Sequence, residues 1–294
     1  MNKYAPTKTQ ADLGLVTVTI FWGTTFILSK IVLADVPLTS FLAIRLNLAA
    51  LVMAVFAWRY RSELNRGVLL HGVILGVFLF VSYLFQMWGI KYTTASNAGF
   101  ITGLNVVFVP IFSVFLFRDR PRLASLVGVL LATFGLYLLS GGDYTTLNRG
   151  DWLVFICSIT VTFHVIFTGK FAPKDNIYLL TAIQLLTTGI LSLSLAVIDG
   201  STIPSFSLNT TLLMVYLAIF GTVYTFLMQT AMQRYTTATR TALVFSLEPV
   251  FAALFAFWFA DELLTDLGWF GGGFILLGML IAEIKWVNIF NSGK

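Results

Sequence analysis

Charged side chains are scarce in this sequence of 294 residues: Asp, Glu, Lys and Arg make up 11% of it, whereas hydrophobic residues make up 58%. In a water-soluble domain about a quarter of all residues are charged, because its surface must be solvated. So few charges cannot cover a soluble globule of this length. We therefore expect most of the surface to face the hydrocarbon of a lipid bilayer.

Cysteine is nearly absent: Cys157 is the single one, which excludes a disulfide framework and a cysteine-based metal cluster. The two histidines, His71 and His164, have no partner at metal-ligand spacing. A phosphate-binding loop is also lacking, because no Lys-Ser or Lys-Thr follows the glycines at 271–273. We expect no metal, no cofactor and no nucleic-acid partner, and we attribute the net charge of +5 to cytoplasmic loops.

Long apolar runs are what the sequence does have. A helix needs about 20 mainly apolar residues to cross a bilayer. Such stretches predict an all-α integral membrane protein of ten transmembrane helices. They lie at about 12–33, 38–58, 68–90, 94–117, 122–140, 151–171, 177–198, 209–232, 236–260 and 265–287.

One stretch occurs twice. Residues 86–119 and 229–262 align without a gap, so that Gln86 meets Gln229 and Tyr92 meets Tyr235, 143 positions further on. The first and sixth spans match at an offset of 139 instead. A self-match at half the chain length indicates an internal duplication.

The distribution of Lys and Arg predicts the orientation of the two halves. With the N-terminus inside, fourteen of the eighteen lie in cytoplasmic segments and three, Lys30, Lys91 and Arg149, lie outside. This asymmetry predicts that both termini are cytoplasmic. Because five spans per half is an odd number, the second half enters the membrane from the opposite side. We expect two inverted five-helix repeats, residues 1–143 and 144–294, within one membrane domain, as in many secondary transporters.

The order and spacing of short motifs carry a family resemblance. They are Trp22-Gly23-Thr24, Ile44-Arg45-Leu46, Lys91-Tyr92-Thr93-Thr94-Ala95 and the run from Leu247 to Leu254. With them the chain resembles the EamA-type branch of the drug/metabolite transporter superfamily, and bacterial amino-acid and metabolite exporters in particular. One departure is that the family often has Pro at the position of Val106, whereas this chain has Pro110.

Ionisable and amide side chains in the middle of spans are costly and tend to face a cavity or a partner. Arg45, His164 and Glu248 are such residues, and Asn105 is the counterpart of Glu248 in the other half. Glu248 is either a substrate or proton ligand, or a structural group that pairs with Arg45 or bonds beside Pro249; we prefer the structural interpretation for Glu248 and Arg45. For His164, titration near neutral pH and simple packing both stay open.

The family fold implies a central cavity that binds substrate. Aromatic faces and a few directed hydrogen bonds suit a small amphipathic solute, although Trp and Tyr also anchor helices at the membrane interface. The candidate cavity residues are Trp22, Thr24, Tyr83, Gln86, Asn97, Thr102, Asn105, His164, Tyr224 and Glu248.

The doubled stretch also suggests how transport proceeds. Tyr92 and Tyr235 open equivalent spans on opposite membrane faces, so we expect them at an outer and an inner gate, with Pro110 and Pro249 as hinges. The family resemblance implies export of small metabolites, amino acids foremost, and we expect it to proceed across the bacterial cytoplasmic membrane by alternating access. The alternatives are a drug or cation efflux pump and, with no catalytic constellation to support it, a polytopic enzyme acting on lipids. Proton coupling or facilitated diffusion, and a monomer or a homodimer, stay open.

Glycines at 128, 135, 271 and 278 are spaced by seven within each pair, so that each pair lies on one helix face. Small residues on a face allow neighbouring backbones to approach closely. We expect these glycines in scaffold or dimer contacts.

Overall fold

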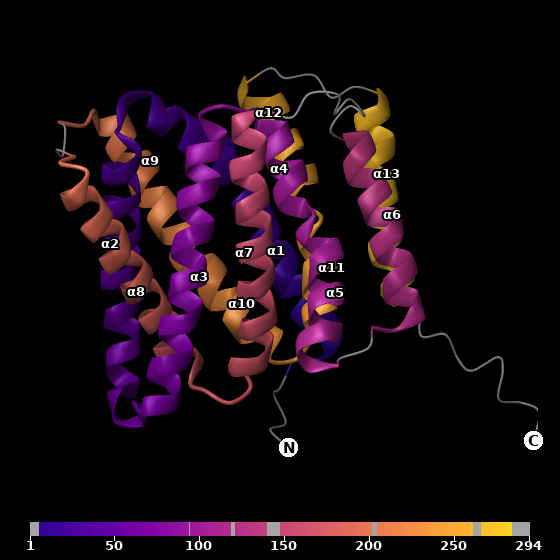
Figure 1. Cartoon of the computed structure of the whole chain (residues 1–294), viewed down its shortest axis with the longest axis horizontal. Helices are drawn as coiled ribbons and strands as arrows, with labels where there is room; N and C mark the ends of the chain where they lie inside the picture. The colour runs from indigo at the N-terminus through magenta and orange to yellow at the C-terminus, as the bar shows by residue number, and fades with distance from the viewer. Residues whose placement is uncertain are drawn as a thin grey trace, which may run out of the picture.

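The computed structural model describes residues 6–93, 95–118, 121–139, 148–201, 205–260 and 266–283, and every regular element among them is helical (Figure 1). Several helices begin at a side-chain cap, as when Thr7 and Gln10 bond to each other's backbone at the first helix. The elements are α1 (Lys8–Asp35), α2 (Leu38–Ala57), η1 (Trp58–Glu63), α3 (Arg66–Ile90), α4 (Ala95–Gly103), α5 (Asn105–Phe117), α6 (Leu123–Leu139), α7 (Arg149–Phe171), α8 (Ile177–Ile198), α9 (Leu208–Ala218), η2 (Ile219–Tyr224), α10 (Thr225–Gln233), α11 (Ala238–Phe245), α12 (Glu248–Ala260) and α13 (Asp266–Glu283).

Every expected span is occupied by helix. Among the described residues, eight helical segments are long and apolar enough to cross a membrane. Two shorter apolar helices, Leu123–Leu138 and Asp266–Ile281, lie where the fifth and tenth spans are expected. The count of ten crossings and the side on which the termini lie stay predictions. Below, the end of the bundle where α1 begins is called the inner end, and the opposite end is called the outer end.

Two spans are interrupted near their middle. The fourth is divided at Leu104 into α4 and α5, and the ninth at residues 246–247 into α11 and α12. Pro249 has no N–H to offer the carbonyl of Phe245, which explains the second interruption. The first lies beside Gly103, a poor helix former, whereas Pro110 is inside α5. The structure therefore interrupts the fourth span at Leu104, away from Pro110, which we expect to act as a hinge.

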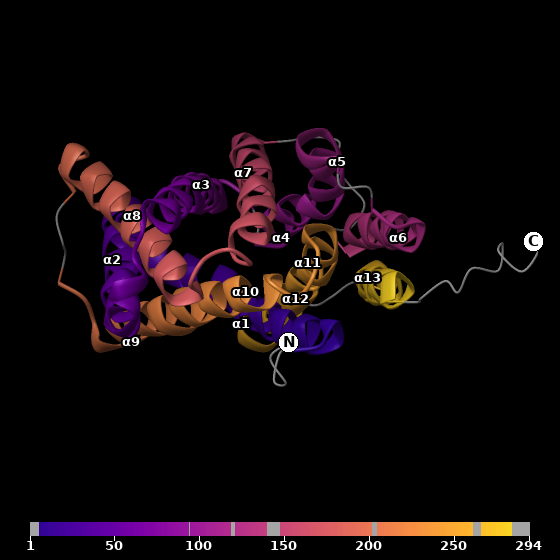
Figure 2. The ribbon, with the colours of Figure 1, turned by 90° about the horizontal axis from the view of Figure 1, so that it is seen from below.

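The helices pack in two rows closed at each end by a pair (Figure 2). Helix α2 packs against α8 at one end, and α6 packs against α13 at the other. Between these pairs lie α1, α3, α7, the α9–α10 span and the two interrupted spans. Each closing pair joins one helix from each half at equivalent places, so the six central spans are the ones left to surround a site.

Glycines make the contact between α6 and α13. A Cβ atom on Gly135 would lie 2.5 Å from the carbonyl oxygen of Gly271, and one on Gly278 would lie 2.6 Å from that of Gly128. The two contacts are related by the repeat. These four glycines thus form the expected scaffold contact, which joins the two halves within one chain and requires no dimer.

Replacing Gly135 with Ala should lower the melting temperature of the purified protein. The new methyl group would meet backbone atoms of Gly271 and Ile275, which cannot rotate away, and such overpacking costs about 1–3 kcal/mol. Gly273→Ala on α13 is the matched control, because a Cβ there has no atom within 4 Å. Equal melting temperatures for both variants would contradict the close contact.

Candidate functional site

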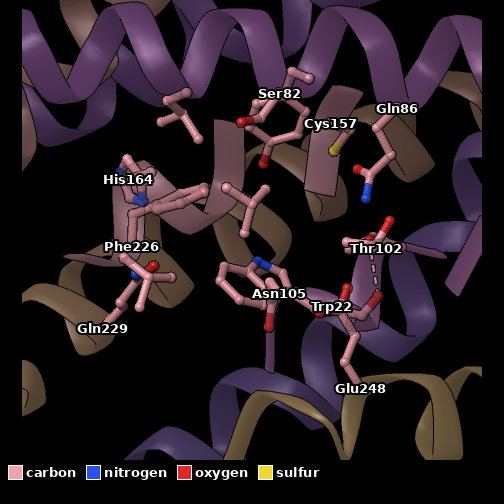
Figure 3. A pocket seen from close by; sticks show the side chains of 15 residues that line it. Trp22, Ser82, Gln86, Thr102, Asn105, Cys157, His164, Phe226, Gln229 and Glu248 are labelled. Atoms are coloured by element: carbon pink, nitrogen blue, oxygen red, sulfur yellow. Dashed lines mark hydrogen bonds between the residues drawn. The ribbon is translucent and has the colours of Figure 1, made fainter. Parts of the chain in front are cut away.

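A cavity of about 60 Å³ lies among the central spans (Figure 3). Its walls come from α1, α3 and α7, from α10, and from both interrupted spans at their interruptions. It has room for a few water molecules or a small head group, but it is smaller than the usual pocket for a whole metabolite. The lining residues are Trp22, Thr25, Leu79, Ser82, Tyr83, Gln86, Thr102, Asn105, Cys157, Val161, His164, Val165, Phe226, Gln229 and Glu248.

Phe226 is the centre of an aromatic wall. Its ring lies 5.5 Å from that of Trp22, 5.6 Å from that of His164 and 6.1 Å from that of Tyr83, measured between centroids. These rings meet at tilted or edge-on angles, which lets the positive edge of one ring meet the negative face of another. The wall thus offers aromatic faces to an apolar group or to a cation.

The polar part of the lining is rich in atoms that lack a hydrogen-bond partner. The Thr102 hydroxyl, the Asn105 carbonyl oxygen Oδ1 and the Gln229 carbonyl oxygen Oε1 are buried without one. Glu248 is 8% exposed and forms no ion pair within the described part of the chain. Because buried polar groups are nearly always hydrogen-bonded, this cluster is suited to a ligand or to water.

Arg45 and Glu248 do not form the permanent bridge that we had considered. The Arg45 guanidinium is buried and donates to Thr222 Oγ1 at 3.1 Å, Gly221 O at 3.2 Å, Tyr83 OH at 3.3 Å and Ser29 Oγ at 3.4 Å. All four acceptors are neutral. Gly221 and Thr222 lie in the π-helical turn η2, where the wider winding leaves backbone oxygens open to side chains. Arg45 therefore ties α2 to α1, α3 and η2 behind the cavity wall.

The cavity lining follows the internal repeat. Offsets of 139 and 143 pair Thr25 with His164, Tyr83 with Phe226 and Asn105 with Glu248. Gln86 and Gln229 form a pair that has kept the same residue. The two halves thus contribute equivalent positions whose chemistry has mostly diverged.

The structure brings seven of the predicted cavity residues to this cavity, and two others face elsewhere. Thr24 bonds to the hydroxyl of Tyr216 at 3.0 Å, and Tyr224 bonds to the hydroxyl of Thr17 at 2.7 Å. Both therefore lie in the contacts that α1 makes with α9 and η2, and neither lines the cavity. The side chain of Asn97 lies outside the described residues. The seven are Trp22, Tyr83, Gln86, Thr102, Asn105, His164 and Glu248.

Several lining residues were missed by sequence reasoning. Gln229 had a signal, because it aligns with Gln86, and the same offset leads from Tyr83 to Phe226. Thr25 had the same kind of signal, because the offset of 139 pairs it with His164, whereas Ser82 had none beyond its helical spacing from Gln86. Cys157 also lines the cavity and is a free thiol.

The two gate tyrosines lie at opposite ends of the bundle. At the outer end, the guanidinium carbon Cζ of Arg149 lies over the ring of Tyr92, 5.5 Å from the centroid of that ring. At the inner end, Tyr235 lines a second cavity of about 610 Å³. Pro249 packs against Gly99 and Gly103 of α4, where a Cβ atom would lie 3.7 Å and 3.3 Å from the proline ring. It thereby couples the two interrupted spans.

These features define a multi-pass helical membrane protein with a small cavity between two related halves. The sequence model of the EamA-like transporter family matches the chain twice, over residues 9–141 and 148–283. The chain belongs to this family, and the double match agrees with the internal duplication.

Several similar proteins carry the name of transporter. An Archaeoglobus fulgidus protein named "uncharacterized transporter" is 35% identical over 94% of this chain and 86% of its own length. The protein PagO of Salmonella typhimurium is 24% identical over 83% of each chain. A solved crystal structure superposes with a TM-score of 0.76 over 94% of this chain and 96% of the other, at 20% identity, and so shares the fold. Family and relatives indicate a transporter and point away from an enzyme.

Proposed function

We propose that this protein is a secondary transporter that exports small amine-bearing metabolites, amino acids and related amphipathic solutes foremost, across the bacterial cytoplasmic membrane by alternating access. The observation that carries the proposal is the cavity at the two helix interruptions, with equivalent residues from both halves in its wall. Inverted-repeat transporters bind their substrates near the midplane between discontinuous helices.

The outer entrance is tightly packed. Thr93 donates to the Asp151 carboxylate at 2.5 Å, and Asp151 also caps α7. Gly89 and Gly150 let α3 and α7 touch there, since a Cβ on Gly150 would lie 2.7 Å from the Gly89 carbonyl oxygen. This end fits a closed gate.

The inner entrance has the equivalent pair in a looser setting. Asp12 and Thr236 correspond to Asp151 and Thr93 in the repeat, and their side chains are 3.3 Å apart. Asp12 also accepts from Arg240 at 2.6 Å. The cavity of about 610 Å³ opens beside them, with Lys8, Arg118, Arg122, Lys170, Arg234 and Arg240 in its lining, as the positive-inside rule predicts for a cytoplasmic mouth.

An apolar layer separates this mouth from the central cavity. Val165 faces the central cavity and Ile166 faces the mouth, and both belong to one buried cluster with Leu15, Val18 and Phe245. We infer an occluded conformation that is biased toward the inner side. The halves would rock about the interruptions at Leu104 and Pro249, with Pro110 softening α5 below the first, so that opening one gate closes the other.

The second candidate, a pump for organic cations, is favoured by the absence of Lys and Arg from the described cavity lining. The carboxylate of an amino acid would have to rely on neutral donors such as the Trp22 indole and the Gln86 amide, whereas an ammonium group would meet Glu248. Proton exchange at Glu248 or His164 is the proposed coupling.

Export is tested in proteoliposomes loaded with a panel of amino acids, primary amines and quaternary ammonium ions. At least one solute should leave faster than from liposomes without protein, and a pH gradient should change the rate. If no solute in the panel moves while a lipid is consumed, the enzyme alternative replaces the proposal.

A further inference from the structure

A chain of two glutamines fixes the orientation of one cavity amide. Gln233 Nε2 donates to the carbonyl oxygen of Val165 at 3.0 Å, and Gln229 Nε2 donates to Gln233 Oε1 at 2.9 Å. A backbone carbonyl only accepts, so Gln233 must direct its NH₂ group to Val165 and its oxygen to Gln229. Gln229 must then use its own NH₂ for Gln233. Its oxygen, Oε1, is left buried at the cavity without a partner.

A second chain fixes the ring of His164 in the same way. The Thr230 hydroxyl donates to the carbonyl oxygen of Phe226 at 2.7 Å, so it accepts from Gln184 Nε2 at 3.4 Å. Gln184 therefore directs its oxygen to His164 Nε2, at 2.9 Å. In the neutral ring this nitrogen carries the hydrogen, and the other nitrogen, Nδ1, is an acceptor.

Both hydrogen-bond chains leave acceptors at the cavity, and other acceptors line the same cavity. Asn105 Oδ1 and the Thr102 hydroxyl are buried without partners, and Glu248 adds a carboxylate. Figure 3 shows Gln229 and His164 on the Phe226 side of the cavity and Glu248 on the opposite side. A site of this composition is satisfied by a ligand that brings several N–H donors.

The first half of the chain lacks both arrangements. The repeat places Ile90 where Gln233 would be, and Arg45 where Gln184 would be. Gln86, the counterpart of Gln229, therefore has no equivalent anchor. The anchored acceptors are a specialisation of one half and cannot be a by-product of the duplication.

We propose that Gln229 and His164 determine specificity by accepting N–H hydrogen bonds from a primary or secondary organic ammonium substrate, and that Gln233 and Gln184 are positioning residues that hold them in this role. The proposal rests on the proposed function and narrows it. A quaternary ammonium ion keeps the charge but has no N–H, so it would leave the acceptors unpaired. Sites built around fixed hydrogen-bonding groups reject ligands that lack the matching group.

The test measures binding to the purified full-length protein by calorimetry, with 2-phenylethylamine and its N,N-dimethyl and N,N,N-trimethyl derivatives. The wild-type protein should bind the primary amine about tenfold or more tightly than the trimethyl compound, as is usual when buried acceptors go unpaired. In Gln233→Leu, the Gln229 amide is free to rotate, and the preference should fall to within about threefold. Gln229→Leu should do the same.

Asn47→Leu is the matched control: it also replaces a side-chain amide that donates to a backbone carbonyl, Gly189 O at 2.9 Å, but it lies outside the cavity lining, so the preference should stay intact. Equal affinities for all three compounds in the wild-type protein would overturn the proposal, and so would an unchanged preference in folded Gln233→Leu and Gln229→Leu. If proteoliposomes move none of the compounds although the binding preference holds, the proposed function fails and the assignment of the acceptors stands.

Discussion

Replacing Glu248 with Gln should weaken the binding of organic ammonium ions by about 10- to 100-fold, because a hydrogen bond to a charged group contributes about 1.5–3 kcal/mol and each 1.4 kcal/mol is a factor of ten. Glu248 is the single carboxylate in the described cavity lining. Gln has nearly the same volume, so the wall should keep its shape. Calorimetry with 2-phenylethylamine measures the loss of affinity.

The same variant should abolish the response of transport to an imposed pH gradient if Glu248 exchanges a proton for the substrate. The wall of the central cavity also contains His164, Tyr83 and Cys157 as ionisable groups. The variant His164→Gln is therefore tested in parallel. We expect a flat pH profile in proteoliposomes for Glu248→Gln and a retained slope for His164→Gln. Unchanged affinity and pH response, together with a lower melting temperature, would support the structural interpretation of Glu248.

A rescue experiment separates the charge from its position. Asn105 occupies the equivalent place in the other half, on the same cavity. The double variant Asn105→Asp/Glu248→Gln therefore moves the acid across the internal symmetry and keeps one negative charge in the site. Partial recovery of ammonium binding is expected, whereas Asn105→Asp alone should strengthen it.

The spans were predictable because a bilayer leaves the backbone few options. Each spanning segment must satisfy its own hydrogen bonds, so length and apolarity determine where helices lie. The interruption at Leu104 was not predictable in this way. It lies beside Gly103, which packs against Leu136 and against Pro249 of the other half, and the second of these contacts joins residues far apart in the sequence.

The site was predictable where the repeat and the helix period were both used. Thr24 and Tyr224 each lie two positions from a true lining residue, Trp22 and Phe226. Two positions rotate a side chain by about 200° around a helix, to the opposite face. Phe226 itself had no compositional signal, because a phenylalanine in an apolar run looks like any lipid-facing or packing residue.

A second substitution with a large expected effect lies at the outer end, where Gly150 of α7 touches Gly89 of α3. Gly150→Ala should hold the outer entrance apart and reduce transport strongly. The added Cβ would lie 2.7 Å from Gly89 O, 2.8 Å from Thr93 N and 2.9 Å from the Tyr92 carbonyl carbon. All three are backbone atoms, so α3 or α7 must move. An overpacking cost of about 1–3 kcal/mol borne only by the closed form shifts the population toward the open one by about 5- to 150-fold.

Cys157 reports this shift, because it lines the central cavity and is the single cysteine of the chain. A membrane-impermeant maleimide added from the outside should label it faster in Gly150→Ala than in the wild-type protein. Gly169→Ala is the control on the same helix, since its Cβ would meet Gln233 Nε2 at 3.6 Å and Ala238 Cβ at 3.8 Å, which are ordinary contacts. Equal outside labelling in folded Gly150→Ala and Gly169→Ala would mean that this end does not open. The site would then be reached from one side only, and alternating access would fail for this chain.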